Sequence, residues 1–193
     1  MMKFFETIKI EKGEILNLKY HNLRLNKTIN EIYKRKSDLD LKEFIKVPDL
    51  KSYRCKVIYD QEIRSVELTE YKERNFNSFK FINSNIEYRY KSVDREELNN
   101  LFEQRENYDD IIIVHDGLIC DTTIANIAVY DGLKWFTPKK PLLFGTQRAK
   151  LLENKIITEK DIKIKDFKNL VSFAIMNALI GFREIKNAKF GDI

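Results

Sequence analysis

The sequence predicts a mixed protein of the α+β or α/β class, with a small α/β domain at residues 1–73 and a larger domain at residues 74–193. A continuous β-branched run at 111–114 and a second apolar run at 125–130 predict buried strands, because an Asp-Gly turn follows each of them. After Gly145, apolar residues recur at helical spacing. Buried strands and a helix within one stretch indicate the mixed class.

The first domain is predicted to contain two pairs of strands and two helices. Residues 4–10 have strand character, a Lys-Gly turn follows, and the chain returns as a strand at 15–18, which gives a hairpin. Apolar residues from about Lys19 to Tyr33 follow helical spacing. The remaining predicted elements are a helix at 38–45 and paired strands at 53–59 and 63–71.

A linker is predicted near the start of residues 75–85, which are richer in Asn and Ser. Beyond it, short strands are predicted at 79–81 and 86–90. A helix is expected after Asp94, whose carboxylate suits an N-cap. The last predicted strands are a weak one at 161–164 and a strong, buried one at 170–176.

Composition favours one large or two small hydrophobic cores. The chain has 193 residues, of which 43% are hydrophobic. It contains no apolar run long enough to span a bilayer and no signal peptide. Cys55 and Cys120 are far apart in the sequence and lack metal-ligand spacing, so a cytoplasmic location is the simplest interpretation and no metal site is expected.

Charge gives little support for a nucleic-acid partner. The net charge is +5 and the pI is about 9.0, which a nucleic-acid-binding protein would share. However, the 35 basic and 30 acidic residues are interleaved without a dense basic block. A small-molecule substrate is therefore preferred over nucleic acid, and the two histidines make histidine-based triad chemistry improbable.

Residues 109–152 carry the strongest functional signal. Gly145 stands just before a helix start, where backbone N–H groups and the helix dipole favour an anion. The motifs D-T-T-I-A-N at 121–126, T-P at 137–138 and L-L-x-G-T-x-R at 142–148 follow one another. In order and spacing they resemble the class IV aminotransferases, which are fold-type-IV pyridoxal-phosphate (PLP) enzymes.

The resemblance extends from Phe5 to about Ile185. It implies a fold with a small N-terminal α/β domain and a larger C-terminal, β-barrel-like α/β domain that binds PLP. It also implies a homodimer with active sites near the interface. A PLP enzyme needs a lysine for the Schiff base, a carboxylate at the pyridine nitrogen, an anion cradle and a residue beneath the ring.

Lys91 is the predicted catalytic lysine. The segment Y-K-S-V-D-R at 90–95 resembles the K-x-x-N-R pattern of the family in its lyase form. Asp121 matches the acidic residue that meets the pyridine nitrogen, where the family usually has Glu. Thr122 and Asn126 follow at positions that could orient Asp121 and the ring hydroxyl.

The predicted phosphate cradle consists of Gly145, Thr146 and Gln147, together with Arg24 from the first domain. Arg24 matches the arginine of the family's H-x-x-R-L motif, and its guanidinium suits bidentate binding of phosphate. Gln147 replaces the usual threonine. Leu143 matches the aliphatic residue beneath the ring, a position that plain core packing explains equally well.

Three features resemble aminodeoxychorismate lyases more than transaminases. Asn177 and Ala178 belong to an N-A-L sequence, whereas transaminases usually carry a G-T pair at this cofactor-binding position. Thr7 is the third residue of F-E-T, and the resemblance implies that its hydroxyl helps to protonate the leaving fragment. Glu96 stands where transaminases commonly have a tyrosine.

The implied reaction converts 4-amino-4-deoxychorismate to 4-aminobenzoate and pyruvate, a step of folate synthesis. A PLP-dependent aminotransferase of branched-chain or D-amino acids is the alternative, and a non-catalytic relative is a third hypothesis. Since the chain begins almost at Phe5, the family's N-terminal strand segment is expected to be missing. The loop that often supplies an arginine for the substrate carboxylate is short, which leaves Arg64 as the predicted substrate residue.

Overall fold

The computed structural model describes residues 1–191, and the chain divides into two compact units. Unit 1 contains residues 1–73 together with 90–94, and unit 2 contains residues 74–89 and the chain from Arg95 onward. The segment 90–94, which the sequence prediction grouped with the second domain, thus lies in the first unit. Few helices and large sheets confirm the predicted mixed class.

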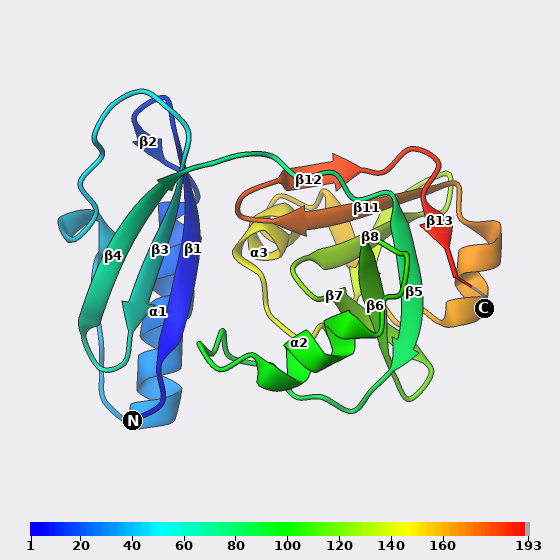
Figure 1. Ribbon diagram of the computed structural model, residues 1–193, viewed down its shortest axis with the longest axis horizontal. Coiled ribbons are helices and arrows are strands. Elements are labelled where there is room, and N and C mark those ends of the chain that lie inside the picture. The colour runs from blue at the N-terminus through cyan, green and yellow to red at the C-terminus, as the bar shows by residue number, and fades with distance from the viewer. Residues whose placement is uncertain (192–193) are drawn as a thin grey trace. The chain divides into compact units, whose positions relative to one another are not determined.

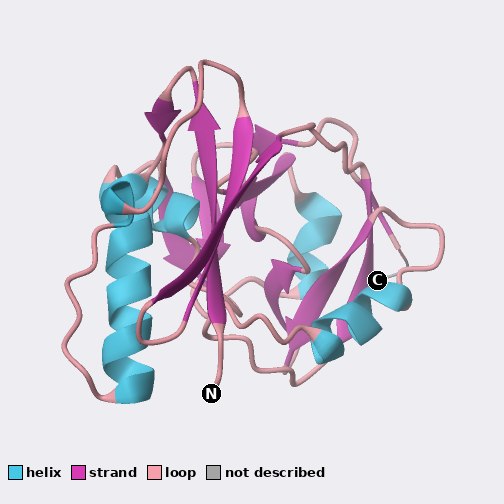
Figure 2. Ribbon diagram, turned by 60° about the vertical axis from the view of Figure 1, so that its left-hand side comes forward, coloured by secondary structure: helices cyan, strands magenta, loops and turns pink. Residues whose placement is uncertain are grey.

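Unit 1 is an antiparallel sheet with one long helix against it (Figures 1 and 2). Its elements are β1 (Phe4–Glu11), β2 (Glu14–Ile15), α1 (Leu18–Tyr33), β3 (Tyr53–Tyr59) and β4 (Ile63–Glu70). The strand order is β2-β1-β3-β4, and every neighbouring pair is antiparallel. The predicted first strand, first helix and strand pair are therefore confirmed.

The second strand of the hairpin is shorter than predicted. It ends at Ile15, because Asn17 adopts a left-handed conformation (φ 56°) and α1 begins at the next residue. Asparagine tolerates this conformation better than most residues do, which lets the chain turn directly from strand to helix.

The helix predicted at 38–45 is wrong. Only the 3-10 turn η1 (Leu41–Glu43) forms there, because Asp40 directly before it is extended (φ −106°, ψ 113°) and its side chain accepts a hydrogen bond from Lys42 N. Asn26 Oδ1 accepts a hydrogen bond from Leu39 N at 2.9 Å, and Asn22 Oδ1 accepts one from Leu41 N at 3.0 Å. Such side-chain bonds compete with helix formation.

Alternation along β1 separates two faces of the sheet. Phe4, Glu6 and Ile8 lie on the face that packs against α1, whereas Phe5 and Thr7 lie on the opposite face. The core on the helix side consists of Phe4, Ile8, Ile10, Leu25, Ile29, Leu41, Ile45, Cys55, Val57 and Tyr59.

Unit 2 is built on a nine-stranded sheet with two helices (Figure 1). Its strands are β5 (Ser78–Asn83), β6 (Asp110–His115), β7 (Leu118–Thr122), β8 (Asn126–Tyr130), β9 (Trp135–Pro138), β10 (Ile157–Lys160), β11 (Ser172–Asn177), β12 (Gly181–Glu184) and β13 (Lys189–Phe190). The helices are α2 (Glu96–Glu103) and α3 (Thr146–Glu153), with a 3-10 helix η2 (Ile164–Asn169).

The sheet of unit 2 branches at β8. The main path runs β10-β9-β8-β7-β6-β5-β13, while β11 pairs with β8 and continues to β12. The predicted strands at 111–114, 125–130 and 170–176 correspond to β6, β8 and β11 and are confirmed. Aromatic and aliphatic side chains of this unit form a hydrophobic core that includes Phe79, Ile112, Ile127, Phe173 and Ile175.

The strand predicted at 86–90 does not form. Ile86 and Tyr88 are buried instead by packing against Leu98, Ile111 and Ile113. Every second side chain of this segment is buried, which explains the alternating pattern, but the segment pairs with no strand in the described part of the chain.

Two further boundaries differ from the prediction. The strand expected at 161–164 is found earlier in the sequence, as β10. Within the described part of the chain, residues 161–164 form one isolated bridge, between Lys163 and Leu118. The helix expected after Asp94 is confirmed as α2, but Arg95 rather than Asp94 occupies its N-cap position.

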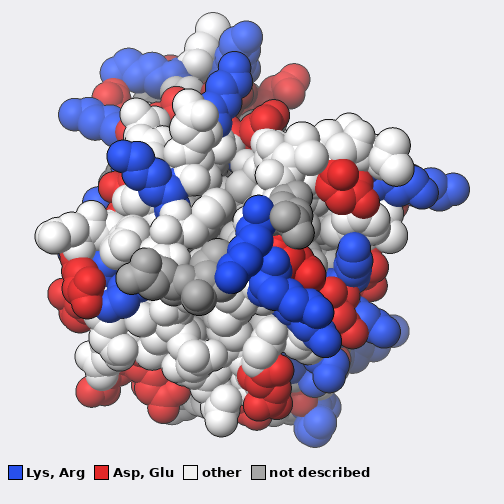
Figure 3. Space-filling view, turned by 90° about the vertical axis from the view of Figure 1, so that its right-hand side faces the viewer, with Lys and Arg blue, Asp and Glu red and all other residues white. Residues whose placement is uncertain are grey.

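None of the helices in the described part of the chain has the length and hydropathy needed to cross a bilayer. Acidic side chains lie among the basic ones on the face drawn in Figure 3, as the interleaved sequence predicts. This distribution gives no support for a nucleic-acid surface on that face.

A buried carboxylate ties β1 to α1. Glu6 has no exposed surface, and its two oxygens accept hydrogen bonds from Arg24 Nε at 2.8 Å and Arg24 Nη2 at 2.5 Å. His21 Nδ1 lies 2.5 Å from Glu6 Oε2. Burial alone would raise the pKa of Glu6, but the Arg24 charge and the His21 hydrogen bond outweigh it and lower the pKa from 4.5 to about 2.

The pKa of the neighbouring His21 is also lowered. Burial is the main cause, and the hydrogen bond that His21 donates to Glu6, which acts in the opposite direction, does not compensate. Because an ionised carboxylate only accepts hydrogen bonds, Nδ1 of His21 carries the hydrogen and donates it to Glu6.

We expect the Glu6 network to make unit 1 sensitive to acid. The folded-state pKa of Glu6 lies below its unfolded value, so its contribution to the free energy of unfolding is present above about pH 4.5 and is lost as the pH falls toward 2. The contribution is on the order of 3 kcal/mol. Glu6→Gln should lower the midpoint of thermal unfolding at neutral pH and flatten its dependence on pH between 4.5 and 2.

The matched control is Glu14→Gln, which removes an exposed carboxylate from the neighbouring strand β2. Its unfolding midpoint should follow the wild-type curve across the whole pH range. Identical pH curves for Glu6→Gln and Glu14→Gln would contradict the role given to the buried network.

Candidate functional site

The structure distributes the predicted site residues over both units. Unit 1 contains the four predicted residues Thr7, Arg24, Arg64 and Lys91. Unit 2 contains the residues predicted around the cofactor ring and phosphate, namely Asp121, Thr122, Asn126, Leu143, Gly145, Thr146, Gln147, Asn177 and Ala178.

Lys91 is fixed against the start of β1. Its carbonyl accepts a hydrogen bond from Phe5 N at 2.9 Å, and Ser92 forms an isolated bridge with Phe4. The half-buried Lys91 side chain places Nζ 4.7 Å from the centroid of the Phe5 ring. A lysine amine is thus held over an aromatic ring, within the range of a cation–π contact.

Thr7 lies on the same face of β1 as Phe5, two residues further along the strand. The structure therefore brings the predicted catalytic hydroxyl to the side of the sheet on which the Lys91 amine is found. On β3, the residue directly opposite Thr7 is Lys56.

The two predicted arginines of unit 1 occupy different surroundings. Arg24 is mostly buried, with 14% of its side chain exposed, and Glu6 holds the Nε–Nη2 edge of its guanidinium. Arg64 is 45% exposed and bonds through Nε to both oxygens of Asp60, at 2.9 and 2.8 Å, on the β3–β4 hairpin. Arg64 is therefore neutralised by its own hairpin.

Asp121 is the buried carboxylate of unit 2. Oδ1 accepts a hydrogen bond from Asn126 Nδ2 at 2.8 Å, and Oδ2 accepts one from Leu143 N at 3.0 Å. Burial raises the pKa of Asp121 to about 6, although these two hydrogen bonds and the Arg148 charge act against the rise. A buried carboxylate in this state gains stability from a positively charged N–H partner.

Asn126 links Asp121 to the segment before α3. The same Nδ2 donates to Leu143 O at 2.8 Å, so one amide group binds both Asp121 and the Leu143 backbone. A Cβ atom on Gly145 would lie 2.0 Å from Asn126 Oδ1, which leaves room only for glycine at this position.

The start of α3 is polar and buried. Thr146, Gln147 and Arg148 are 3%, 8% and 3% exposed. Arg148 Nη2 donates to Pro138 O at 2.9 Å and to Glu159 Oε1 at 2.6 Å, which anchors the helix to β9 before it and β10 after it. Buried amides at the N-terminal end of a helix form an environment that favours an anion.

Thr122 and Asn177 organise turns. Thr122 Oγ1 accepts hydrogen bonds from Ile124 N at 3.3 Å and Ala125 N at 3.1 Å. Asn177 Nδ2 donates to Ile124 O at 3.1 Å, while its Oδ1 accepts from the backbone of the turn that contains Ala178. The structure therefore joins the Asn177 turn to the turn that follows Asp121.

Sequence reasoning missed the buried pair of Glu6 and His21. An acidic residue at an inward position of an alternating strand is a usable signal for a buried ion pair. His21 and Arg24 stand three residues apart, which places both on one side of α1. Asp110 and Arg95 were also missed; Asp110 accepts from Thr123 Oγ1 at 2.7 Å, and Arg95 donates to Thr123 O at 2.9 Å.

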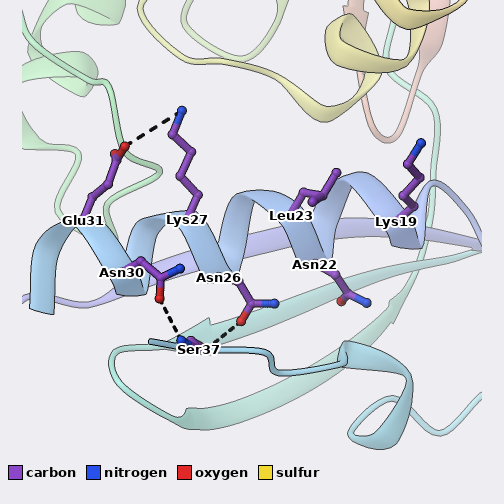
Figure 4. A pocket seen from close by; sticks show the side chains of 8 residues that line it. All are labelled: Lys19, Asn22, Leu23, Asn26, Lys27, Asn30, Glu31 and Ser37. Atoms are coloured by element: carbon purple, nitrogen blue, oxygen red, sulfur yellow. Dashed lines mark hydrogen bonds and ion pairs between the residues drawn. The ribbon is translucent and has the colours of Figure 1, made fainter. Parts of the chain in front are cut away.

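A shallow groove along α1 contains none of the predicted residues (Figure 4). Its polar side chains bind one another: Ser37 Oγ donates to Asn26 Oδ1 at 2.6 Å, and Ser37 N donates to Asn30 Oδ1 at 2.7 Å. An ion pair of 3.9 Å joins Lys27 and Glu31. These internal contacts are typical of a solvated helix face rather than a catalytic site.

We expect Gly145→Ala to destabilise unit 2, because the new methyl group would overlap the Asn126 amide. Overpacking of this kind typically costs about 1–3 kcal/mol. Thermal unfolding of Gly145→Ala, Asn126→Ala and the double variant measures the coupling. If the overlap is the cause, Gly145→Ala should cost much less in the Asn126→Ala background; equal costs in both backgrounds would contradict it.

Comparison with known proteins agrees with this arrangement. The family model described as "Amino-transferase class IV" matches residues 83–188. An uncharacterized protein of Haemophilus influenzae is 35% identical over 187 residues, which is 94% of this chain and 100% of that protein.

Two solved structures have the same fold. The crystal structure of a "putative 4-amino-4-deoxychorismate lyase" from Haemophilus somnus is 34% identical, with a TM-score of 0.88, and covers 94% of this chain and 98% of its own. A "hypothetical aminotransferase" from Mycobacterium tuberculosis in its PLP-bound form is 14% identical, with a TM-score of 0.80, covering 97% of this chain and 81% of its own. Together with the family match, these comparisons show that the chain belongs to the class IV aminotransferase family of fold-type-IV enzymes.

Proposed function

We propose that this protein is a PLP-dependent lyase that converts 4-amino-4-deoxychorismate to 4-aminobenzoate and pyruvate. The observation that carries the proposal is the position of Thr7, whose hydroxyl belongs to the same sheet face as the Lys91 amine over Phe5. A lyase needs a proton donor for its leaving group in addition to a lysine, and a transaminase does not. The name of the Haemophilus somnus relative supports the same activity.

The residues of unit 1 fit one set of cofactor groups. Lys91 offers a primary amine that is positioned by its backbone bond to Phe5. Arg24 would bind the phosphate through its guanidinium, and Glu6 would orient it because both oxygens of Glu6 hold one edge of the fork.

The residues of unit 2 fit the remaining groups. Asp121 is a buried carboxylate whose raised pKa favours a cationic N–H partner, as a protonated pyridine nitrogen provides. The α3 start at Gly145, Thr146 and Gln147 would bind phosphate, and Leu143 would lie beneath the ring. We assign Asn126, Thr122, Asn177 and Ala178 to the support of these groups, since they organise the turns around Asp121.

PLP supplies a sink for the electrons that are released when the substrate loses a proton. In the proposed mechanism, Lys91 Nζ removes the ring proton, and the bond between the ring and the enolpyruvyl oxygen breaks. Thr7 Oγ helps deliver a proton to the methylene of the leaving enolate, which becomes pyruvate. The proton lost from the ring balances the proton gained by the methylene, so the step needs no further reactant.

An aminotransferase is the alternative, since the family model that matches this chain is described as amino-transferase class IV. Its reaction uses the same lysine and carboxylate but forms no enolpyruvate. We further propose a homodimer, which the resemblance implies, and a cytoplasmic location, which the two free, buried cysteines support.

The cofactor assignment predicts that PLP attaches to Lys91. Reduction with borohydride should leave a phosphopyridoxyl group on the peptide that contains Lys91, identified by mass spectrometry. Lys91→Ala should lose this modification while retaining its fold by circular dichroism, because the Lys91 side chain is only half-buried. A phosphopyridoxyl group on a different lysine of the wild type would remove Lys91 from the assignment.

Thr7→Val separates the two candidate reactions. Valine keeps the β-branched shape and removes the hydroxyl, so PLP affinity should change little. Loss of a general acid should lower kcat for aminodeoxychorismate by about 10²-fold or more.

A transaminase forms no such leaving fragment, so conversion of an amino acid to its keto acid should respond much less. Equal turnover of aminodeoxychorismate by wild type and Thr7→Val would exclude the role of Thr7. If wild type fails to turn over this compound but transfers amino groups readily, the lyase proposal is wrong and the aminotransferase takes its place.

A further inference from the structure

A second lysine stands beside the proposed catalytic residues of unit 1. Lys56 on β3 is the Cα partner of Thr7 on β1. Directly opposite residues project to the same face of a sheet, with Cβ atoms about 5 Å apart. Lys56 Nζ lies 5.8 Å from the centroid of the Phe5 ring, which Lys91 Nζ also approaches, to 4.7 Å. Two lysine side chains therefore share one aromatic ring next to a hydroxyl.

Lys56 is half-buried and carries a charge that no nearby anion balances. Within residues 1–191 its ammonium contacts the Phe5 ring and forms neither an ion pair nor a hydrogen bond. Its register partner on β4 is Glu67, which is exposed and makes no ion pair with it in that part of the chain. By contrast, Lys9 on the same face pairs with Glu11 at 2.7 Å.

We propose that Lys56 binds a carboxylate of the substrate beside Thr7. This inference rests on the proposed lyase function, because it assigns that carboxylate to the enolpyruvyl group. In this group the carboxylate and the methylene are both attached to the enol carbon. A carboxylate held by Lys56 therefore keeps the methylene close to the Thr7 hydroxyl that is proposed to protonate it.

Lys56 takes the role that the sequence prediction gave to Arg64. The Arg64 guanidinium is 45% exposed and already bound to both oxygens of Asp60. A half-buried ammonium has already lost part of its hydration, so binding a carboxylate costs it less further desolvation than it costs a fully solvated ammonium. The half-buried ammonium therefore gains more from the carboxylate. Substrates with a second carboxylate are thereby selected over ordinary amino acids.

The test uses chorismate, which has both carboxylates of the proposed substrate and no amine, so it reports anion binding without the reaction. Its dissociation constant is measured by calorimetry on the full-length, PLP-loaded protein. Lys56→Gln should weaken chorismate binding by about 10-fold or more, the size of one charge-assisted hydrogen bond. Lys56→Arg should restore most of the affinity.

Arg54→Gln is the matched control, because Arg54 is two residues away on the same strand and face and is exposed. It removes the same charge, so a general electrostatic effect would weaken binding equally in both variants. Lys56→Gln should also raise KM for aminodeoxychorismate more than Arg54→Gln does.

The outcomes separate the two proposals. Equal chorismate affinity in wild type and Lys56→Gln, or no chorismate binding by wild type, overturns the assignment of Lys56. If wild type binds chorismate through Lys56 but releases no pyruvate from aminodeoxychorismate, the carboxylate contact is upheld and the lyase proposal is overturned.

Discussion

The buried contact between Glu6 and Arg24 is the interaction on which unit 1 depends. A carboxylate without exposed surface is costly unless charge and hydrogen bonds compensate for lost water, and here Arg24 and His21 provide both. The contact fixes α1 on β1 in one register. Because Glu6 lies between Phe5 and Thr7 in the strand, the same register also sets where those two side chains emerge on the opposite face.

In unit 2 the buried carboxylate is held by a neutral amide, whereas in unit 1 it is held by a charged guanidinium. Asn126 binds the Asp121 carboxylate and the Leu143 carbonyl with one nitrogen, and its oxygen fills the space that a Gly145 side chain would need. The positions of the acidic residue, the aliphatic residue and the helix start are thus fixed relative to each other by one side chain. Preorganised groups of this kind avoid reorganisation when a ligand binds.

Local signals predicted much of the fold and part of the site. The β-branched run at 111–114 gave a strand because such residues fit a buried sheet whatever their neighbours are. The helix predicted at 38–45 is wrong because Asp40 is extended, in a segment that Asn22 and Asn26 of α1 bind through contacts that local sequence does not show. Lys56 could not be selected from sequence, since its importance comes from the register between β1 and β3 rather than from any motif.

The path of the chain limits how the protein could be dissected. Residues 90–94 leave unit 2, run beside β1 and return, so the boundary is crossed three times and neither unit is a continuous stretch of polypeptide. A fragment cut after residue 73 would lack the backbone partner of Phe5 and the lysine itself. Recombination at that junction would therefore pair β1 with a lysine segment from a different protein, which favours inheritance of both units together.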